Sequence, residues 1–236
     1  MEKQEKIVSM FDDIASTYDT ANRVMSMGVD IAWRKKACDL VYEYLAKKEI
    51  DRIIDVACGT GDMMGHWQKQ AAKANIAIKE IIGVDPSNGM VDVARQKFPD
   101  FHYHIAKATE IPLEDEKADI VSITYGIRNV VQRQEAFYEF NRVLKQGGLV
   151  VILEFMKQDK KTLKDKIRDF YMHKILPYVG GAISKNLEAY TYLPDSIESF
   201  VTVAGMQDEL QKAGFEMLYT QSFSMDISTL FIARKK

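Results

Sequence analysis

The sequence predicts an α/β fold with a doubly wound, mostly parallel, seven-stranded sheet and a C-terminal antiparallel hairpin. Nearly continuous apolar runs alternate with helical stretches through the middle of the chain, which is typical of parallel strands covered on both faces. After the last helical stretch, two strand-like runs are separated by only a short connection. That spacing permits an antiparallel pair and leaves no room for a crossover helix.

The individual elements follow from apolar patterning and from helix stop and start signals. The expected parallel strands are 52–57, 78–84, 101–106, 118–125 and 149–155, and the helices between them are 62–74, 87–97 and 134–144. Ser87 is a suitable N-cap for the second helix, and residues 145–148 (Lys-Gln-Gly-Gly) are expected to stop the third. A last helix, 206–212, ends at Gly214, and the hairpin strands are 215–223 and 227–234.

Composition excludes several classes of protein. With 236 residues, 47% of them hydrophobic, the chain fits one folded domain rather than a disordered segment. A net charge of −2 argues against a nucleic-acid binder that relies on bulk charge. Cys38 and Cys58 are too few for a disulfide framework, and no metal-ligand spacing is visible, so we expect a reducing compartment and no metal. Without a signal-peptide pattern or a membrane span, the expected location is cytoplasmic.

The strongest functional pattern lies at the ends of the first two strands. Asp55, Gly59, Thr60 and Gly61 close the first strand, and Asp85 ends the second, where an acid can accept both hydroxyls of a ribose. Position 64 is methionine, whereas a dinucleotide fingerprint needs glycine or alanine there, so an NAD site is disfavoured. A nucleoside ligand without phosphates remains, and S-adenosylmethionine fits.

Three further segments carry a resemblance to a known family. They are residues 18–33 (YDTANRVMSMGVDIAW), residues 125–130 (YGIRNV) and residues 142–155, which contain RVLKQGG and a later Glu-Phe pair. With the glycine turn they resemble the UbiE/MenG/Coq5 family of quinone-biosynthesis C-methyltransferases, from about Phe11 to the C-terminus. The resemblance implies a Rossmann-like class I methyltransferase fold. Asp30 and Lys107 depart from the family pattern, which usually has His and Asn or Asp there.

The resemblance and the strand-end pattern together give a set of cofactor residues. These are Asp55, Gly59, Thr60, Gly61, Asp85, Lys107, Ala108 and Thr124. Structural alternatives stay open for five of them. Thr124 could instead belong to ordinary strand packing, and the Lys107 side chain could instead be only solvated. Asp55 could instead hold the glycine turn through backbone hydrogen bonds, and Thr60 and Asp85 could instead cap the helices that follow them.

The catalytic residues that the resemblance implies are Arg128, Asn129 and Tyr18. A buried arginine needs a partner, so Arg128 is either paired within the protein or placed against an anionic substrate oxygen. The proton acceptor is left open between Tyr18, Asp19, His173 and water. The implied reaction is C-methylation of a polyprenylated quinol in menaquinone or ubiquinone biosynthesis. The alternatives are another small-molecule methyltransferase or a non-catalytic, cofactor-binding scaffold of the quinone pathway.

We expect one domain, 1–236, with an N-terminal helical cap (1–50) and a substrate-facing insertion (156–200). Within the insertion an apolar helical stripe is flanked by excess basic residues, and its members are Leu163, Ile167, Phe170, Tyr171 and Ile175. This pattern predicts a weak, salt-sensitive peripheral contact with the inner face of the membrane, or else packing on the sheet. Leu176-Pro177 should end that helix, Gly180-Gly181 should form a hinge, and residues 190–194 should offer an aromatic wall for a prenyl tail. Whether the chain forms a homo-oligomer is left open.

Overall fold

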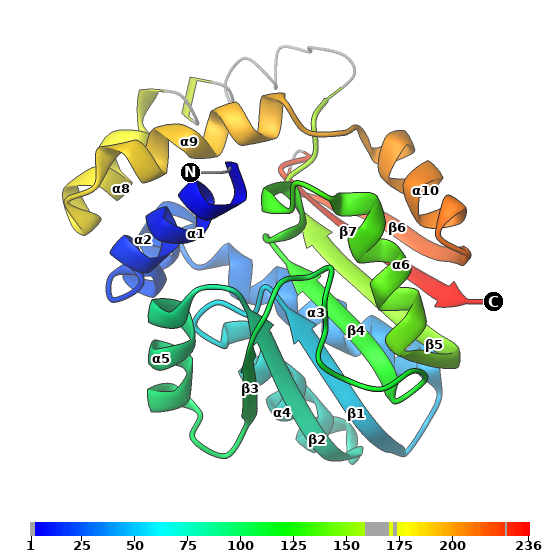
Figure 1. The fold of residues 1–236 in the computed structure, drawn as a ribbon. Coiled ribbons are helices and arrows are strands. Elements are labelled where there is room, and N and C mark those ends of the chain that lie inside the picture. The colour runs from blue at the N-terminus through cyan, green and yellow to red at the C-terminus, as the bar shows by residue number, and fades with distance from the viewer. Residues whose placement is uncertain (1–2, 159–169, 172–173, 225) are drawn as a thin grey trace.

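The computed structural model describes residues 3–158, 170–171, 174–224 and 226–236, and contains the expected seven-stranded sheet (Figure 1). The strand order is β3-β2-β1-β4-β5-β7-β6. The strands are β1 (Glu49–Val56), β2 (Ala77–Asp85), β3 (His102–Ile105), β4 (Ala118–Thr124), β5 (Leu144–Glu154), β6 (Phe215–Phe223) and β7 (Ser228–Lys235). The pairs among β1 to β5 are parallel, whereas β7 runs antiparallel to both β5 and β6, so the predicted fold class is confirmed.

Helices cover both faces of this sheet, because successive strand residues point to opposite sides. Ile53 of β1 packs with α3 and α4, whereas its neighbour Ile54 packs in a second core with α6 and α10. The helices of the described residues are α1 (Lys3–Ile14), α2 (Tyr18–Met25), α3 (Val29–Leu45), α4 (Asp62–Ala74), α5 (Asn88–Lys97), α6 (Arg133–Val143), α8 (Leu176–Ser184), α9 (Leu187–Glu198) and α10 (Val203–Lys212), with a short 3₁₀ turn η1 (Ile127–Asn129).

A helical cap lies over the carboxyl ends of the parallel strands. Figure 1 shows α1, α2, α8 and α9 beyond the arrowheads of these strands. They share a third apolar cluster that includes Ile14, Met25 and Leu176, and the Tyr171 hydroxyl donates to the Met25 carbonyl at 2.7 Å. Helices α1 and α2 therefore meet α8 and α9, which are far from them in the sequence, in one layer.

One boundary prediction is wrong. Helix α6 ends at Val143, and residues 145–148 lie in β5 rather than before it. Leu144 already pairs with Ala118, and the register shifts between Ala118 and Ile120, so the glycines sit in an irregular stretch of the strand. The predicted helix end before Leu176-Pro177 agrees with the structure, since residues 170, 171 and 174 are helical and Ile175 is a turn. A new helix, α8, then begins at Leu176, because proline suits the first helical turn.

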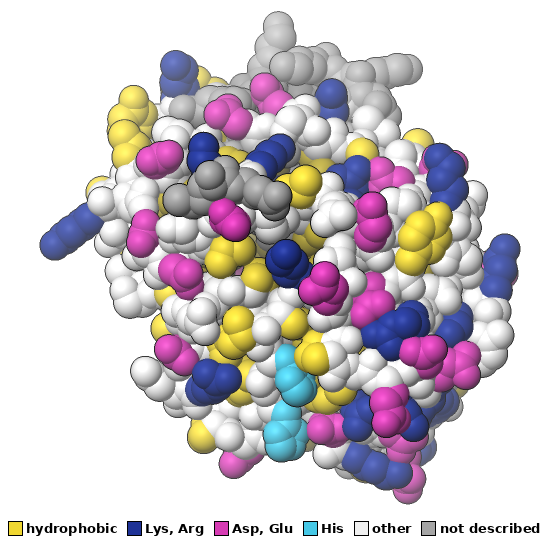
Figure 2. Space-filling view, in the orientation of Figure 1, with side chains coloured by type: hydrophobic (Ala, Val, Ile, Leu, Met, Phe, Trp, Pro, Cys, Tyr) yellow, Lys and Arg dark blue, Asp and Glu magenta, His cyan; other side chains and the backbone are white. Residues whose placement is uncertain are grey.

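The expected hinge is also wrong, because Gly180 and Gly181 lie inside α8. A Cβ at Gly180 would come within 2.3 Å of the Tyr190 ring, so glycine here permits close packing of α8 on α9. Of the predicted apolar stripe, Leu163 and Ile167 lie outside the described residues, as does His173. None of the described helices is long and apolar enough to cross a bilayer. Figure 2 shows basic and acidic side chains interspersed over the visible face, without a field of one sign.

Candidate functional site

A cavity of about 520 Å³ opens between the cap and the carboxyl ends of the strands. It draws its walls from α1, the turns after β1, β2, β3 and β4, and the start of the loop after η1. Ligands of doubly wound sheets bind at this edge. Seven of the eleven residues predicted from the sequence line it: Tyr18, Gly59, Asp85, Lys107, Ala108, Thr124 and Asn129.

The glycine turn after β1 brings backbone to the cavity wall. Gly59 and Gly61 have φ angles of +53° and +82°, which residues with a side chain rarely adopt. A Cβ added at Gly61 would lie 3.0 Å from the Phe98 ring, whereas at Gly59 nothing lies within 4 Å. A ligand can therefore lie directly against the backbone at Gly59.

Asp85 fixes the turn from the neighbouring strand. Its Oδ2 accepts from the Gly59 N–H at 2.8 Å and its Oδ1 from the Ser87 N–H at 2.9 Å. Burial raises the pKa of Asp85 to about 6. Ser87, not Asp85, caps α5, since the Ser87 hydroxyl accepts from the Met90 N–H at 3.1 Å. Each carboxylate oxygen keeps lone-pair capacity for a ribose hydroxyl.

Asp55 and Thr60 are not among the lining residues. Asp55 is buried and accepts from the Ser122 hydroxyl at 2.6 Å, and burial raises the pKa of Asp55 to about 7. The Thr60 hydroxyl donates to Asp19 of α2, and the N-cap of α4 is Gly61. The structure therefore shows neither the backbone hydrogen bonds considered for Asp55 nor the helix cap considered for Thr60. Gly61, the third predicted residue of this turn, also lies outside the lining.

Arg128 also lies behind the cavity wall, held in a buried ion pair. Its Nη1 donates to Glu154 Oε1 at 2.6 Å and to the Tyr125 carbonyl at 2.7 Å, and its Nε donates to Ser196 at 3.3 Å. The exposed side-chain fractions are 7% for Arg128 and 0% for Glu154. Burial raises the pKa of Glu154, and the Arg128 charge counteracts it. Of the two options raised by the sequence, the structure shows the internally paired arginine.

Tyr18 and Asn129 lie on the cavity wall where the cap meets the end of β4. Asn129 Oδ1 accepts from the Tyr192 hydroxyl of α9 at 3.1 Å, so its amide nitrogen is the group left for a further partner. Burial raises the pKa of Tyr18, although the charge of Arg128 opposes that shift. Asp19, another candidate proton acceptor, is engaged by Thr60 and by Lys97 at 2.6 Å.

The first helix forms the roof of the cavity. The sequence predicted an N-terminal helical cap, but not which residues of this helix line the cavity. Ile7, Val8 and Phe11 of α1 line the cavity. Asp12 Oδ1 accepts from the Ser87 hydroxyl at 2.6 Å and from the Gly89 N–H at 2.9 Å, which docks α1 on the start of α5. The spacing of apolar residues in 7–14 could have indicated an amphipathic helix, but nothing in it identifies the surface covered.

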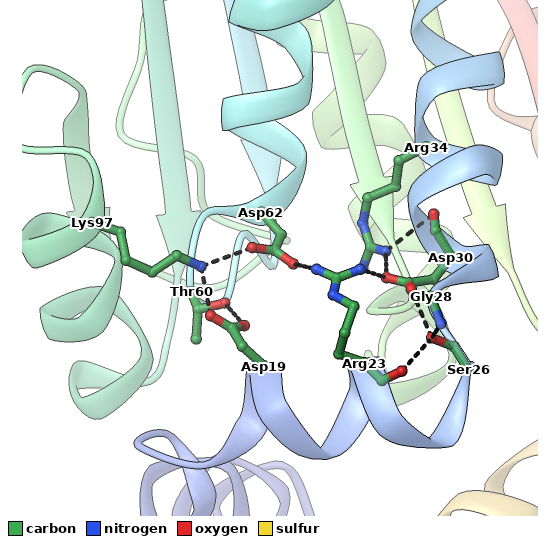
Figure 3. A network of polar contacts seen from close by, with 9 residues as sticks. All are labelled: Asp19, Arg23, Ser26, Gly28, Asp30, Arg34, Thr60, Asp62 and Lys97. Carbon is green, nitrogen blue, oxygen red and sulfur yellow. Dashed lines mark hydrogen bonds and ion pairs between the residues drawn. The ribbon is translucent and has the colours of Figure 1, made fainter.

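A chain of polar contacts joins the cap to the glycine turn (Figure 3). Lys97 donates to Asp19 and to Asp62, Arg23 donates to Asp62 and Asp30, and Arg34 donates to Asp30. This chain of contacts therefore ties α2 and α3 to the first turn of α4 and the last turn of α5. The positions that make these contacts are up to 78 residues apart in sequence.

The cavity suits a nucleoside with an apolar ring and a polar sugar. Asp85 supplies a charged acceptor, and Gly59 exposes its backbone to the cavity. Met90 and Phe11 supply apolar surface. Lys107 and Ala108 follow β3 on the same wall. No cluster of metal-binding side chains occurs among the residues that the structure describes.

Comparisons with known proteins identify a family and a fold for this chain. The model of the ubiE/COQ5 methyltransferase family matches residues 1–235. A ubiquinone/menaquinone biosynthesis C-methyltransferase UbiE of Campylobacter jejuni is 53% identical over 235 residues, covering 100% of both chains. A demethylmenaquinone methyltransferase of Chlorobaculum parvum is 34% identical, covering 98% of this chain and 93% of the relative. Among solved structures, a SAM-dependent methyltransferase from Thermotoga maritima has a TM-score of 0.63 at 19% identity, covering 98% and 100% of the chains.

Proposed function

Because the chain belongs to the ubiE/COQ5 methyltransferase family, we propose that it methylates a ring carbon of a polyprenylated quinol, such as demethylmenaquinol or a benzoquinol precursor. It is an S-adenosylmethionine-dependent methyltransferase of quinone biosynthesis. The observation that carries the substrate proposal is the full-length match at 53% identity. The quinol, rather than the quinone, is the electron-rich form that attacks an electrophilic methyl group.

The cofactor is proposed to bind along the glycine turn, with its ribose on Asp85. Support comes from the two backbone bonds that fix the Asp85 carboxylate beside the open face of Gly59. The adenine would lie beside Lys107 and Ala108, where backbone groups can bond to it. Asp55, Thr60, Gly61 and Thr124 complete the proposed cofactor set, of which Asp55 would act through Ser122 by holding the end of β1.

The substrate ring is proposed to lie against Tyr18 and Asn129. When bound, S-adenosylmethionine supplies an activated methyl group and leaves as S-adenosylhomocysteine. The protein's part is to align the ring carbon, exclude water and stabilise the phenolate oxygen. Because Asn129 Oδ1 is occupied by Tyr192, the amide nitrogen is oriented to donate to that oxygen. Arg128 would add a positive charge from behind the wall, and the proton would pass to a water.

A labelling experiment tests this function. The protein is incubated with methyl-labelled cofactor and reduced demethylmenaquinol, or with a polyprenyl benzoquinol. We expect label on a ring carbon by mass spectrometry, together with one S-adenosylhomocysteine per product, and less label at limiting cofactor when Asp85→Ala replaces the wild type. Label on an oxygen would favour another small-molecule methyltransferase. Cofactor binding with no labelled product from either quinol would favour the scaffold.

We also propose that the protein approaches the membrane surface through its cap. Exposed apolar side chains gather at the α2–α3 turn, where Met27 is 83% exposed and Val24 is 50% exposed. On α8, which packs beside α2, Tyr178 is 66% exposed. Lys35, Lys36 and Lys174 are exposed nearby in the sequence and suit anionic lipids. This surface belongs to the same cap whose Tyr192 reaches Asn129 in the cavity.

Vesicle co-sedimentation tests the membrane contact. We expect Met27→Asp to weaken binding to anionic vesicles at low salt. Tyr138→Asp is a matched control, since Tyr138 is 52% exposed on α6, outside the cap. Equal binding by both variants and the wild type would contradict the proposal without affecting the assigned chemistry.

A further inference from the structure

Arg34 has the largest unused hydrogen-bonding capacity in the polar chain of Figure 3. Lys97 and Arg23 each bridge two carboxylates, whereas the bonds of Arg34 reach only Asp30, through Nη1. The Arg34 Nε is buried and has no partner among the residues that the structure describes. A guanidinium carries five N–H donors, and leaving one buried without an acceptor is costly.

The position of Arg34 places this donor beside the functional cavity. Its side chain is 9% exposed, and its Cζ lies 5.2 Å from the centre of the Tyr125 ring. Tyr125 and Tyr18 both line the cavity, and the charge of Arg34 acts on the pKa of each. Among the cations of this polar chain, Arg34 is therefore the one at the end where the cap meets β4.

The cofactor has to extend toward this end of the cavity. Its ribose is assigned to Asp85, which lies on the β2 side of the glycine turn. The strand order puts β4 on the other side of β1, so the amino-acid end of the ligand runs past Gly59 toward Tyr125 and Tyr18. That end carries an α-carboxylate, the acceptor that a guanidinium edge binds best.

Charge balance is compatible with a zwitterionic ligand group at this point. The polar chain contains three carboxylates (Asp19, Asp30, Asp62) and three cations (Arg23, Arg34, Lys97), so it is neutral before a ligand is added. A zwitterionic amino-acid group keeps it neutral, because its carboxylate brings its own ammonium. The Asp30 contact fixes the Nη1 edge of Arg34 and leaves Nε and Nη2 to form a bidentate pair.

We propose that Arg34 is the residue that binds the α-carboxylate of the cofactor's methionyl group, and that Asp30 orients it for this task. The proposal concerns cofactor binding alone. It can therefore fail while the proposed methylation of a quinol stands, and the reverse also holds.

The test compares two ligands that differ only in the amino-acid end. S-adenosylhomocysteine carries the α-carboxylate, and 5′-methylthioadenosine lacks it. In calorimetry without any quinol, we expect Arg34→Met to weaken S-adenosylhomocysteine binding roughly ten- to hundredfold, as for a hydrogen bond to a charged group. Binding of 5′-methylthioadenosine should stay within about twofold of the wild type, and Arg34→Lys should recover part of the lost affinity.

Arg23→Met is the matched control, since Arg23 contacts Asp30 and Asp62 but is 36% exposed. It should disturb the same polar chain while leaving the ligand preference unchanged. An equal loss for both ligands in Arg34→Met would make Arg34 a structural residue and overturn the proposal. Unchanged affinity for both, with a folded protein by circular dichroism, would overturn it as well.

Discussion

The two walls of the cavity are held together in different ways. On the sheet side, the Asp85 carboxylate accepts from the backbone N–H groups of Gly59 and Ser87 at 2.8 and 2.9 Å, and it extends from β2, which is paired with β1 along its length. On the cap side, α1, α2 and α3 are held by charged side chains that reach other elements. The sheet wall is therefore set by fold geometry, whereas the cap wall depends on contacts that single substitutions or solvent conditions can alter.

The largest expected effect concerns the buried Arg128–Glu154 pair behind the cavity wall. It tests whether this pair belongs to the rigid sheet wall. Arg128→Ala leaves Glu154 buried without its cation, which should cost about 3–5 kcal/mol of unfolding free energy. Chemical denaturation measures the loss. The double variant Arg128→Met with Glu154→Gln should recover much of it, because no unpaired charge remains.

Activity of the same variant sharpens the comparison. If Arg128 acts on the phenolate, turnover per folded molecule falls in both variants while cofactor affinity holds. Normal turnover per folded molecule would mean that Arg128 contributes only to folding stability.

Protonation of Asp55 gives the next effect. Burial raises the pKa of Asp55 to about 7, above the value of about 3.9 in an unfolded chain. Protonated Asp55 therefore contributes to the unfolding free energy below about pH 4. This contribution is lost as the pH rises through 7, by up to about 1.4 kcal/mol per pH unit. Asp55→Asn should flatten this part of the denaturation profile and leave the smaller contribution of Asp85, whose pKa is raised to about 6.

Asp119 is a control whose pKa is shifted in the opposite direction from that of Asp55. It is buried at the far end of the sheet, and although burial acts to raise its pKa, bonds with Lys47 and Lys145 keep the pKa below its usual value. Asp119→Asn should remove stability above about pH 4 that the wild type loses as the pH falls. Parallel profiles for the two variants would contradict the assigned environments.

Asp85 tests the sheet wall directly. Asp85→Ala should weaken S-adenosylmethionine binding by about 1.5–3 kcal/mol, because the ribose hydroxyls lose a charged acceptor. The Gly59 and Ser87 N–H groups also lose their partner, so folding is checked in parallel. An unchanged dissociation constant in a folded variant would rule out the ribose role.

The same contrast explains what could be predicted from the sequence. Asp85 and Gly59 could be placed because strand ends and positive φ angles leave local patterns. The docking of α1 through Asp12 could not, since Ser87 lies 75 positions away and no local signal links them. The pairing of Arg128 with Glu154 was one of two readings of a buried arginine, and only the packing of β5 beside β4 decides between them. Proline at 177 correctly indicated the end of one helix, but the new helix that begins there could not be inferred, because proline suits both the start of a helix and the residues after one.

The smallest expected effect concerns the roof of the cavity. Asp12 docks α1 through two bonds at the start of α5, and Asp12→Ala removes the one oxygen, Oδ1, that accepts both. Loss of one helix-start contact of this kind costs about 1 kcal/mol, which corresponds to roughly fivefold faster cofactor release if α1 must lift for exit. Stopped-flow displacement measures the release rate. Asp12→Asn keeps an acceptor oxygen for Ser87 and Gly89, so it should release the cofactor at nearly the wild-type rate. If all three proteins release it equally fast, α1 does not gate the cavity, and the cap wall is as rigid as the sheet wall.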